Sequence, residues 1–227
     1  MAATGNGIAV FSDVDETLIR VKSMFRFLEF YLKARGEPAE TYERLAGELQ
    51  TAALWGAPRS EINRRYYRFY RGESARRLAE AGRRWFTAEW RGCPDGLFVP
   101  EVEEELTAQS KDALVLVSGS FFACLDPIAE DIGADQVLAT RPRVRRGELT
   151  GEVLVPMIGA AKGRAVQAAG AVRGFDLARC SAYGDHLSDL PMLQAVGRPV
   201  AVGNDTELTV HAQRAGWVLL PTGSRRR

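Results

Sequence analysis

The sequence predicts an α/β protein with a doubly wound, mainly parallel sheet and an inserted all-helical cap. Two observations support this prediction. From about residue 96 to the end of the chain, short apolar runs alternate with amphipathic helical stretches. Between about residues 20 and 92, strand signals vanish and helical periodicity dominates. Strand–helix alternation with short connections is typical of a parallel sheet that is covered by helices on both faces.

The composition excludes several classes of protein. The chain has 227 residues, of which 46% are hydrophobic and 26% are charged, and its net charge is +1. This balance gives no global field for nucleic acid or an anionic membrane, and no nucleic-acid-binding motif is present. No apolar run reaches the ~20 residues of a membrane span. The three cysteines lack metal-site spacing, and the N-terminus lacks a signal-peptide core. We therefore expect a cytoplasmic protein.

The elements are predicted in the following order. The apolar run Ile8-Ala9-Val10 predicts a buried strand over residues 8–13. Four helices follow, near residues 23–35, 40–55, 60–71 and 74–90, and Ser23 is the predicted N-cap of the first. Further helices are predicted over 98–109, from after Ser120 to 132, and over 161–169, 190–196 and 206–215. Strands are predicted over 113–117, 136–139, 181–183, 199–202 and 217–220. A β-hairpin is predicted over 141–155, with its turn at Arg146-Gly147.

These elements predict two domains. The catalytic core comprises residues 1–19 and 93–227, and the helical cap comprises residues 20–92. An all-helical block after the first strand is expected to lie over the carboxyl ends of the strands. In open α/β sheets, ligands bind at that end.

Two carboxylates follow the first strand. Asp13 and Asp15 are two residues apart at a strand end, so their side chains project toward the same side of the chain. Neighbouring carboxylates resist ionisation without a cation. This arrangement suits Mg²⁺-assisted phosphoryl transfer, in which Asp13 attacks phosphorus and Asp15 moves the proton. A strand that runs into an acidic turn is the alternative interpretation of these residues alone.

Three later stretches fit the same chemistry. Ser118-Gly119-Ser120 follows a buried strand and precedes a helix, where a hydroxyl and backbone N–H groups can bind phosphate. Lys162 opens a helix and can neutralise phosphate and the attacking carboxylate. Asp185 and Asp189 follow another strand, and carboxylate oxygens suit Mg²⁺. Taken individually, Ser118-Gly119-Ser120 is also compatible with an ordinary turn, and Lys162 with a solvated lysine.

In this order the four stretches resemble the haloacid dehalogenase (HAD) superfamily. Within it they are most similar to the phosphoserine-phosphatase-like subclass IB, whose cap lies between the first and second motifs. The resemblance covers about residues 8–220. It rests on Asp13-Val14-Asp15-Glu16-Thr17, which looks like the DxDxT motif, and on Ser118, Lys162 and Gly184-Asp185 with Asp189.

The resemblance implies the following roles. Asp13 is the nucleophile that becomes an aspartyl phosphate. Asp15 protonates the leaving alcohol and then activates water, and Thr17 helps to position Asp15. Lys162 offsets negative charge at the reacting centre.

The resemblance also implies the binding groups. Ser118 and the Gly119 N–H hold phosphate oxygens, with Thr17 and Lys162 beside them. The implied cofactor is Mg²⁺, bound by Asp13, the backbone carbonyl of Asp15 and Asp185, with Asp189 in support.

Specificity is expected to come from the cap. Phosphoserine phosphatases carry an acidic residue shortly after the first motif, and this chain has Lys22 there. A cation repels an ammonium group, so a substrate that is anionic or rich in hydroxyl groups is expected instead of phosphoserine. The candidate substrate contacts are Lys22, Met24, Phe25, Arg64, Arg65 and His186, of which Arg64 and Arg65 belong to a basic stretch on the third cap helix and His186 follows Asp185.

The leading prediction is a Mg²⁺-dependent phosphatase that hydrolyses a small phosphomonoester, as a monomer or homodimer. A phosphotransferase or mutase is the second possibility, in which an alcohol replaces water as the acceptor. The third is a binding module that has kept the fold without catalysis. Measuring products with and without added alcohols distinguishes these possibilities.

Overall fold

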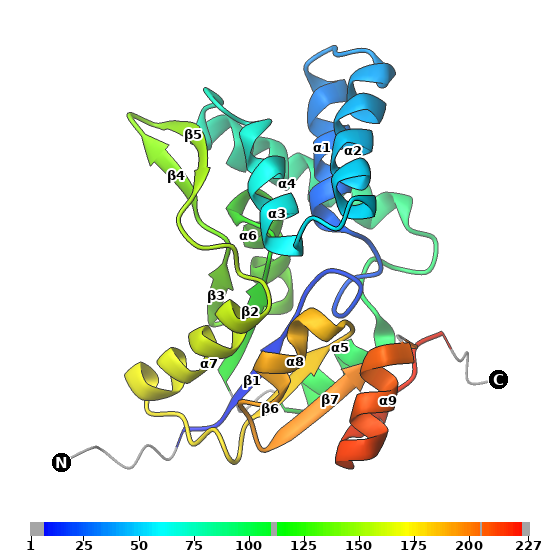
Figure 1. Ribbon diagram of the computed structural model, residues 1–227, viewed down its shortest axis with the longest axis vertical. Helices are drawn as coiled ribbons and strands as arrows, with labels where there is room; N and C mark the ends of the chain where they lie inside the picture. Colours follow the sequence, from blue (N-terminus) through cyan, green and yellow to red (C-terminus); the bar gives the residue numbers. More distant parts are fainter. Residues whose placement is uncertain (1–6, 110–112, 205, 224–227) are drawn as a thin grey trace.

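The computed structural model describes residues 7–109, 113–204 and 206–223. Its central sheet has the strand order β3-β2-β1-β6-β7-β8, and every neighbouring pair is parallel (Figure 1). The strands are β1 (Ala9–Ser12), β2 (Ala113–Ser118), β3 (Gln136–Ala139), β6 (Ser181–Gly184), β7 (Arg198–Val202) and β8 (Val218–Leu220). The parallel sheet that was predicted from the sequence is confirmed.

Both faces of the sheet are covered. Along β1, Val10 belongs to one hydrophobic cluster, whereas Ala9 and Phe11 belong to another, because successive side chains of a strand point to opposite faces. The first cluster includes residues of α5 (Pro100–Ala108) and α6 (Phe122–Ile132). The second includes residues of α7 (Ala160–Arg173), α8 (Leu190–Leu193) and α9 (Thr206–Ala215). This double burial explains the uninterrupted apolar runs.

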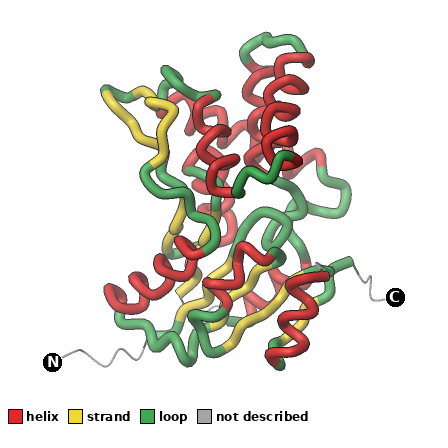
Figure 2. Tube along the Cα trace, viewed as in Figure 1, coloured by secondary structure: helices red, strands yellow, loops and turns green. Residues whose placement is uncertain are grey.

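Four helices stand above the carboxyl ends of β1 and β2 (Figures 1 and 2). They are α1 (Ser23–Ala34), α2 (Ala39–Leu54), α3 (Arg59–Arg68) and α4 (Ala75–Gly92). We propose that they form the cap domain, residues 20–92. The predicted N-cap of α1 is wrong: Lys22 occupies that position, and Ser23 is the first helical residue. The Ser23 hydroxyl lies 2.9 Å from the Ser120 hydroxyl, so it contacts the core instead of the helix backbone.

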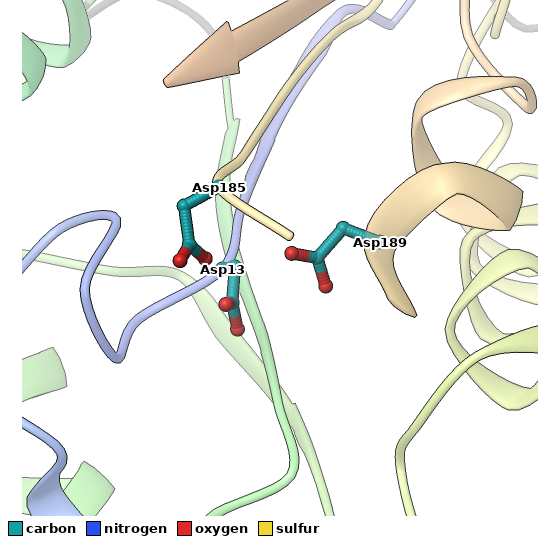
Figure 3. A group of neighbouring side chains, drawn as sticks. All are labelled: Asp13, Asp185 and Asp189. Carbon is teal, nitrogen blue, oxygen red and sulfur yellow. The ribbon is translucent and has the colours of Figure 1, made fainter. Parts of the chain in front are cut away.

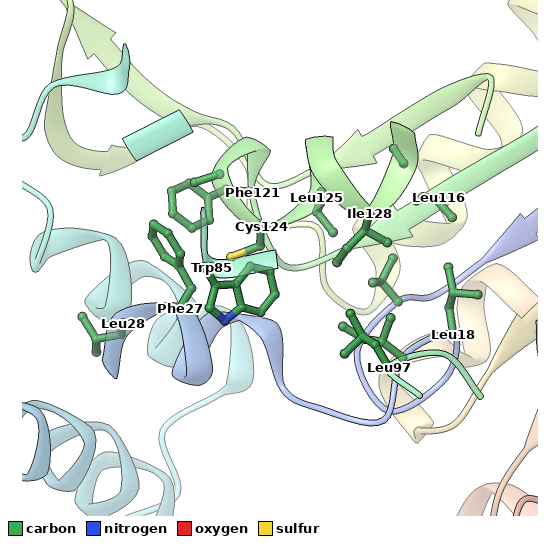
Figure 4. Packing of buried hydrophobic residues seen from close by; sticks show 14 of the residues in the cluster. Leu18, Phe27, Leu28, Trp85, Leu97, Leu116, Phe121, Cys124, Leu125 and Ile128 are labelled. Carbon is green, nitrogen blue, oxygen red and sulfur yellow. The ribbon is translucent and has the colours of Figure 1, made fainter. Parts of the chain in front are cut away.

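The cap and the core share a hydrophobic cluster (Figure 4). Phe27 of α1 packs edge-on against Trp85 of α4 and Phe121 of the core, at centroid distances of 6.1 Å and 5.7 Å. Gly82 lets α4 approach α6 closely, since a Cβ atom there would lie 1.8 Å from the Ala123 carbonyl oxygen. The cap is therefore packed firmly on the core at α4.

Gly82→Ala is expected to destabilise the protein. The added methyl group cannot fit, so α4 and α6 must separate, which costs about 2–4 kcal/mol. Gly47→Ala is the matched control, because a Cβ atom at this helical position meets nothing within 4 Å. It is expected to raise stability by about 0.5–1 kcal/mol through helix propensity. Urea denaturation measures both changes, and equal midpoints for the two variants would contradict the packing argument.

A β-hairpin joins the cap to the core. It consists of β4 (Pro142–Arg145) and β5 (Glu148–Val153), which pair antiparallel around the predicted turn at Arg146-Gly147. The cap–hairpin contact includes three backbone hydrogen bonds: Gly72 N–H to Leu149 O at 2.8 Å, Leu149 N–H to Glu73 O at 2.9 Å, and Ala75 N–H to Gly147 O at 2.9 Å. Within the described residues, no helix is both long and apolar enough to cross a bilayer.

Candidate active site

The sheet order brings the predicted motifs together. β1 lies between β2 and β6, and Asp13 is the residue that follows β1. Ser118 is the last residue of β2, and Asp185 follows β6. The Asp13 N–H donates to the Tyr183 carbonyl at 2.9 Å, which continues the β1–β6 pairing up to the carboxylate. Parallel pairing therefore places these three side chains together at the carboxyl ends of the central strands.

Lys162 of α7 reaches the carboxyl ends of these strands and is only 3% exposed. Its Nζ atom lies 2.6 Å from Asp13 Oδ1 and 2.6 Å from Asp189 Oδ1. Burial alone would lower the pKa of Lys162, but the two carboxylates raise this pKa above its usual value. The amine is therefore charged and is held against Asp13.

Three carboxylates lie close together in the site (Figure 3). Asp13, Asp185 and Asp189 each offer an oxygen within 4.8 Å of the others. Burial raises the pKa of Asp13 to about 7, with further increases from Asp189 and Asp185 and a partial decrease from Lys162. Burial and the Asp189 carboxylate raise the pKa of Asp185 to about 6. Buried carboxylates that destabilise each other's charge form a donor set that fits a hard divalent cation such as Mg²⁺.

Neighbouring groups orient the two carboxylates of the fourth motif. The Thr17 hydroxyl donates to Asp185 Oδ1 at 3.0 Å, so Thr17 contacts Asp185 rather than Asp15, the residue that it was predicted to position. Asp189 uses both of its oxygens, one for Lys162 and the other for the His186 N–H at 3.2 Å. Gly184 permits the close approach of Asp189, because a Cβ atom at this glycine would lie 2.7 Å from Asp189 Cβ.

The loop after β2 is oriented from the cap side. The Gly119 carbonyl accepts hydrogen bonds from Asn63 Nδ2 at 2.9 Å and from the Tyr67 hydroxyl at 3.1 Å. The next N–H, that of Ser120, donates to Ser118 Oγ at 3.1 Å. Because Ser118 Oγ accepts this bond, its own hydrogen remains available to a phosphate oxygen. Asn63 was missed in the sequence analysis, although its spacing to Tyr66 and Tyr67 places it on the inward face of α3.

Asp15 has the properties of a proton donor. Its Oδ1 atom is buried without a hydrogen-bond partner in the described part of the chain. Burial raises the pKa of Asp15 to about 7, and the Asp13 carboxylate adds to this effect, whereas hydrogen bonding from Ser23 opposes it. A carboxyl group with this pKa can hold a proton near neutral pH and release it to a nearby oxygen.

A pocket of about 400 Å³ lies between this site and the cap. Its core lining includes Asp13, Asp15, Ser118, Gly119, Lys162 and Asp185. Four of the predicted substrate contacts also line it, namely Lys22, Met24, Phe25 and His186. Lys22 forms an ion pair with Glu16 at 3.2 Å. His186 Nδ1 accepts the Ser188 N–H at 2.9 Å, so this side chain also stabilises its own loop.

Two predicted substrate contacts lie elsewhere. Arg64 donates to the Val153 carbonyl of β5 at 3.0 Å, and Arg65 Nε donates to Glu61 at 3.1 Å. Neither arginine is among the residues that line the pocket. The arginine that does line it is Arg59, the first residue of α3, which the sequence analysis did not single out.

The fold and the site together define a class of protein. It is a Rossmann-like α/β protein whose parallel sheet carries an acidic cluster and a buried lysine at the ends of its central strands. A helical insertion lies above this polar site. Comparison with known families is consistent with this class. The family described as haloacid dehalogenase-like hydrolase matches residues 10–194. The chain belongs to this family, and its fold is that of phosphoserine-phosphatase-like members.

Individual relatives agree with the family assignment. The chain is 44% identical over 120 residues to the inhibition of morphological differentiation protein of Streptomyces azureus, which covers 52% of this chain and 43% of that protein. It is 29% identical over 226 residues to phosphoserine phosphatase SerB1 of Mycobacterium tuberculosis, covering 92% of this chain and 69% of that protein. The chain thus spans less than half of the first of these relatives.

A solved structure of similar fold comes from Bordetella pertussis Tohama I and is described as a protein with unknown function. Its TM-score is 0.81 at 24% identity, and the alignment covers 96% of this chain and 99% of that chain. This similarity concerns the fold of the whole chain, including the helical insertion.

Proposed function

We propose that this protein is a Mg²⁺-dependent phosphatase that hydrolyses a phosphomonoester of a small molecule. The observation that supports the proposal most directly is the buried Asp13–Lys162–Asp189 arrangement at the base of the pocket, with 2.6 Å between Lys162 Nζ and each carboxylate. A carboxylate held against a cation, next to a protonatable Asp15, is suited to nucleophilic attack on phosphorus.

In the proposed first step, an Asp13 oxygen forms a bond to phosphorus, and the bond between phosphorus and the leaving alcohol oxygen breaks. Asp15 gives its proton to that oxygen. In the second step, water attacks the aspartyl phosphate, Asp15 takes the proton from the water, and the bond between phosphorus and Asp13 breaks. Inorganic phosphate and the original carboxylate result.

The phosphoryl oxygens are held by groups of this chain. The Ser118 hydroxyl and the Gly119 N–H donate to them, and Lys162 offsets their charge. Mg²⁺ would be held by Asp13, the Asp15 carbonyl and Asp185. Asp189 would act indirectly, by holding Lys162. When bound, the ion supplies positive charge where negative charge spreads over the phosphoryl oxygens.

This proposal predicts release of inorganic phosphate from p-nitrophenyl phosphate in the presence of Mg²⁺. EDTA is expected to abolish the release, and added Mg²⁺ is expected to restore it. Without the ion, the negative carboxylates repel the negative phosphoryl group. EDTA-resistant turnover would contradict the metal dependence.

Assays with added acceptor alcohols address the alternative: a phosphotransferase forms alkyl phosphate in preference to inorganic phosphate. The monomeric or homodimeric state and the cytoplasmic location stay predictions from the sequence.

A further inference from the structure

The part of the pocket that faces away from the carboxylates is formed by the cap, and it is mainly apolar. The helices α1, α2 and α3 contribute Met24, Phe25, Leu49, Ala53, Ile62 and Tyr66. A leaving group that extends from a phosphate bound at Ser118 meets this wall. Polar leaving groups need hydrogen-bond partners at such a position, since desolvation without them is unfavourable.

The polar groups within this wall are already engaged. The Tyr66 hydroxyl donates to the Met24 carbonyl at 2.7 Å and lies 2.7 Å from the Tyr70 hydroxyl. The Asn63 amide is bonded to the Gly119 carbonyl. Lys22 is paired with Glu16. Arg59 is the charged exception, because it is exposed and also lines the pocket. The wall therefore offers a leaving group apolar surface and few donors or acceptors.

The apolar surface continues along α2 to the outside of the cap. Leu49 lines both the catalytic pocket and an outer hollow. The hollow combines the apolar residues Ala52, Trp55 and Phe69 with the polar residues Glu48, Thr51, Arg65 and Arg68. At the end of α2, Leu54 and Trp55 are each 87% exposed. The turn that follows them lies at the end of the cap nearest the core (Figure 1). Neither side chain lines the catalytic pocket, but both follow Ala53, which does, and Trp55 lines the outer hollow. They therefore extend the apolar surface beyond the pocket, as in surfaces that bind apolar ligands.

We propose that the substrate is a phosphomonoester whose leaving group is an aliphatic chain, in place of the anionic or hydroxyl-rich group that Lys22 suggested from the sequence. The chain lies on the cap wall at Met24, Leu49 and Ala53 and leaves the pocket past Leu54 and Trp55. This inference rests on the proposed phosphatase function and adds the substrate class to it. Acylated glycerol phosphates and isoprenyl monophosphates share this chemistry.

The test uses n-alkyl phosphates from ethyl to octyl phosphate, each below its critical micelle concentration, with Mg²⁺. We expect kcat/KM to rise roughly two- to fourfold with each added methylene, because each one is transferred from water to apolar surface. Glycerol 3-phosphate and O-phosphoserine are expected to be poorer substrates than hexyl phosphate. An acylglycerol phosphate and farnesyl phosphate, assayed side by side, then distinguish the two sources of the chain.

The two proposals fail in different ways. If all alkyl phosphates are hydrolysed equally well, the aliphatic leaving group is wrong and the phosphatase function stands. If neither alkyl phosphates nor p-nitrophenyl phosphate release phosphate, the phosphatase function itself is contradicted.

Ala53→Asp tests the chain-binding wall. Ala53 is exposed and lines the pocket, so the variant is expected to fold and to place a carboxylate beside the chain. We expect kcat/KM for octyl phosphate to fall by about tenfold or more, with ethyl phosphate changed by less than about twofold. Ala39→Asp is the matched control, because Ala39 is exposed at the other end of α2 and lies outside the pocket lining. It should leave both substrates unaffected.

The double variant Leu54→Ser/Trp55→Ser tests the chain exit. It is expected to reduce activity on octyl phosphate and to spare ethyl phosphate. An equal loss on both substrates would overturn the proposal, because it would indicate that this turn serves cap closure for every substrate.

Discussion

Asp13→Asn is expected to abolish phosphate release, with kcat reduced by about 10⁴-fold or more. An amide oxygen is a poor nucleophile and cannot form the aspartyl phosphate. The substitution keeps the shape of the side chain and an oxygen that can accept from Lys162, which lies 2.6 Å from Asp13 Oδ1 in the native protein. Loss of activity will therefore report on the nucleophile rather than on the fold. The measurement is single-turnover phosphate release with Mg²⁺ in excess.

Asp131→Asn is the matched control for this experiment. Asp131 is an exposed carboxylate of α6, outside the pocket lining. This variant should retain the activity of the native protein. Activity that persists in the Asp13 variant would show that another group attacks phosphorus.

Lys162→Met has the second-largest expected effect, and it acts on both activity and stability. Without the amine, the Asp13 and Asp189 carboxylates lose the cation that each contacts at 2.6 Å. Breaking a buried ion pair by removing one partner typically costs about 3–5 kcal/mol of folding stability. The phosphoryl oxygens also lose a positive charge, for which we expect kcat to fall by about 10²–10³-fold. Steady-state kinetics and urea denaturation in EDTA measure the two effects.

Lys33→Met is the control here, because Lys33 is exposed in the last turn of α1 and lies outside the pocket lining. We expect both its activity and its unfolding midpoint to match those of the native protein. If Lys162→Met behaves in the same way as this control, the lysine neither supports the carboxylates nor assists the reaction.

Much of the site was predictable because several of its residues lie at the ends of predicted strands. Asp13 and Ser118 lie at the ends of short apolar runs, Asp185 follows another predicted strand, and parallel pairing brings such ends together. Their local sequence therefore contains most of the information about their position. Lys162 lies in the first turn of α7, but the sequence also allowed a solvated lysine there, and its burial depends on how α7 packs on the sheet.

The cap was less predictable because its contacts depend on how each helix is rotated. The sequence indicated a basic stretch on α3 that includes Arg64, but the side of the helix that packs inward carries Tyr66 and Tyr67. Arg64 consequently meets the hairpin, whereas Arg59 lines the pocket. Periodicity identifies helix faces, and tertiary packing decides which face meets the core.

Side-chain contacts between segments that are far apart in the sequence could not be predicted from local sequence patterns. The Ser23 hydroxyl contacts Ser120, which is 97 positions away, and nothing near Ser23 in the sequence indicates it. Helix-start chemistry favoured a capping role for this serine. The hydroxyl pair forms because the cap folds back onto the loop after β2.

The cap–hairpin contact has a consequence for the path of reactants. Residues 72–75 are bound to the hairpin by backbone hydrogen bonds, so this margin of the cap is attached to the core. In the α2–α3 turn, the Trp55, Gly56 and Ala57 N–H groups donate to carbonyls within the cap itself, so these amides add no bond to the core. We expect substrate to arrive and alcohol to depart at the α2–α3 turn, and amide hydrogen exchange to be faster there than at residues 72–75.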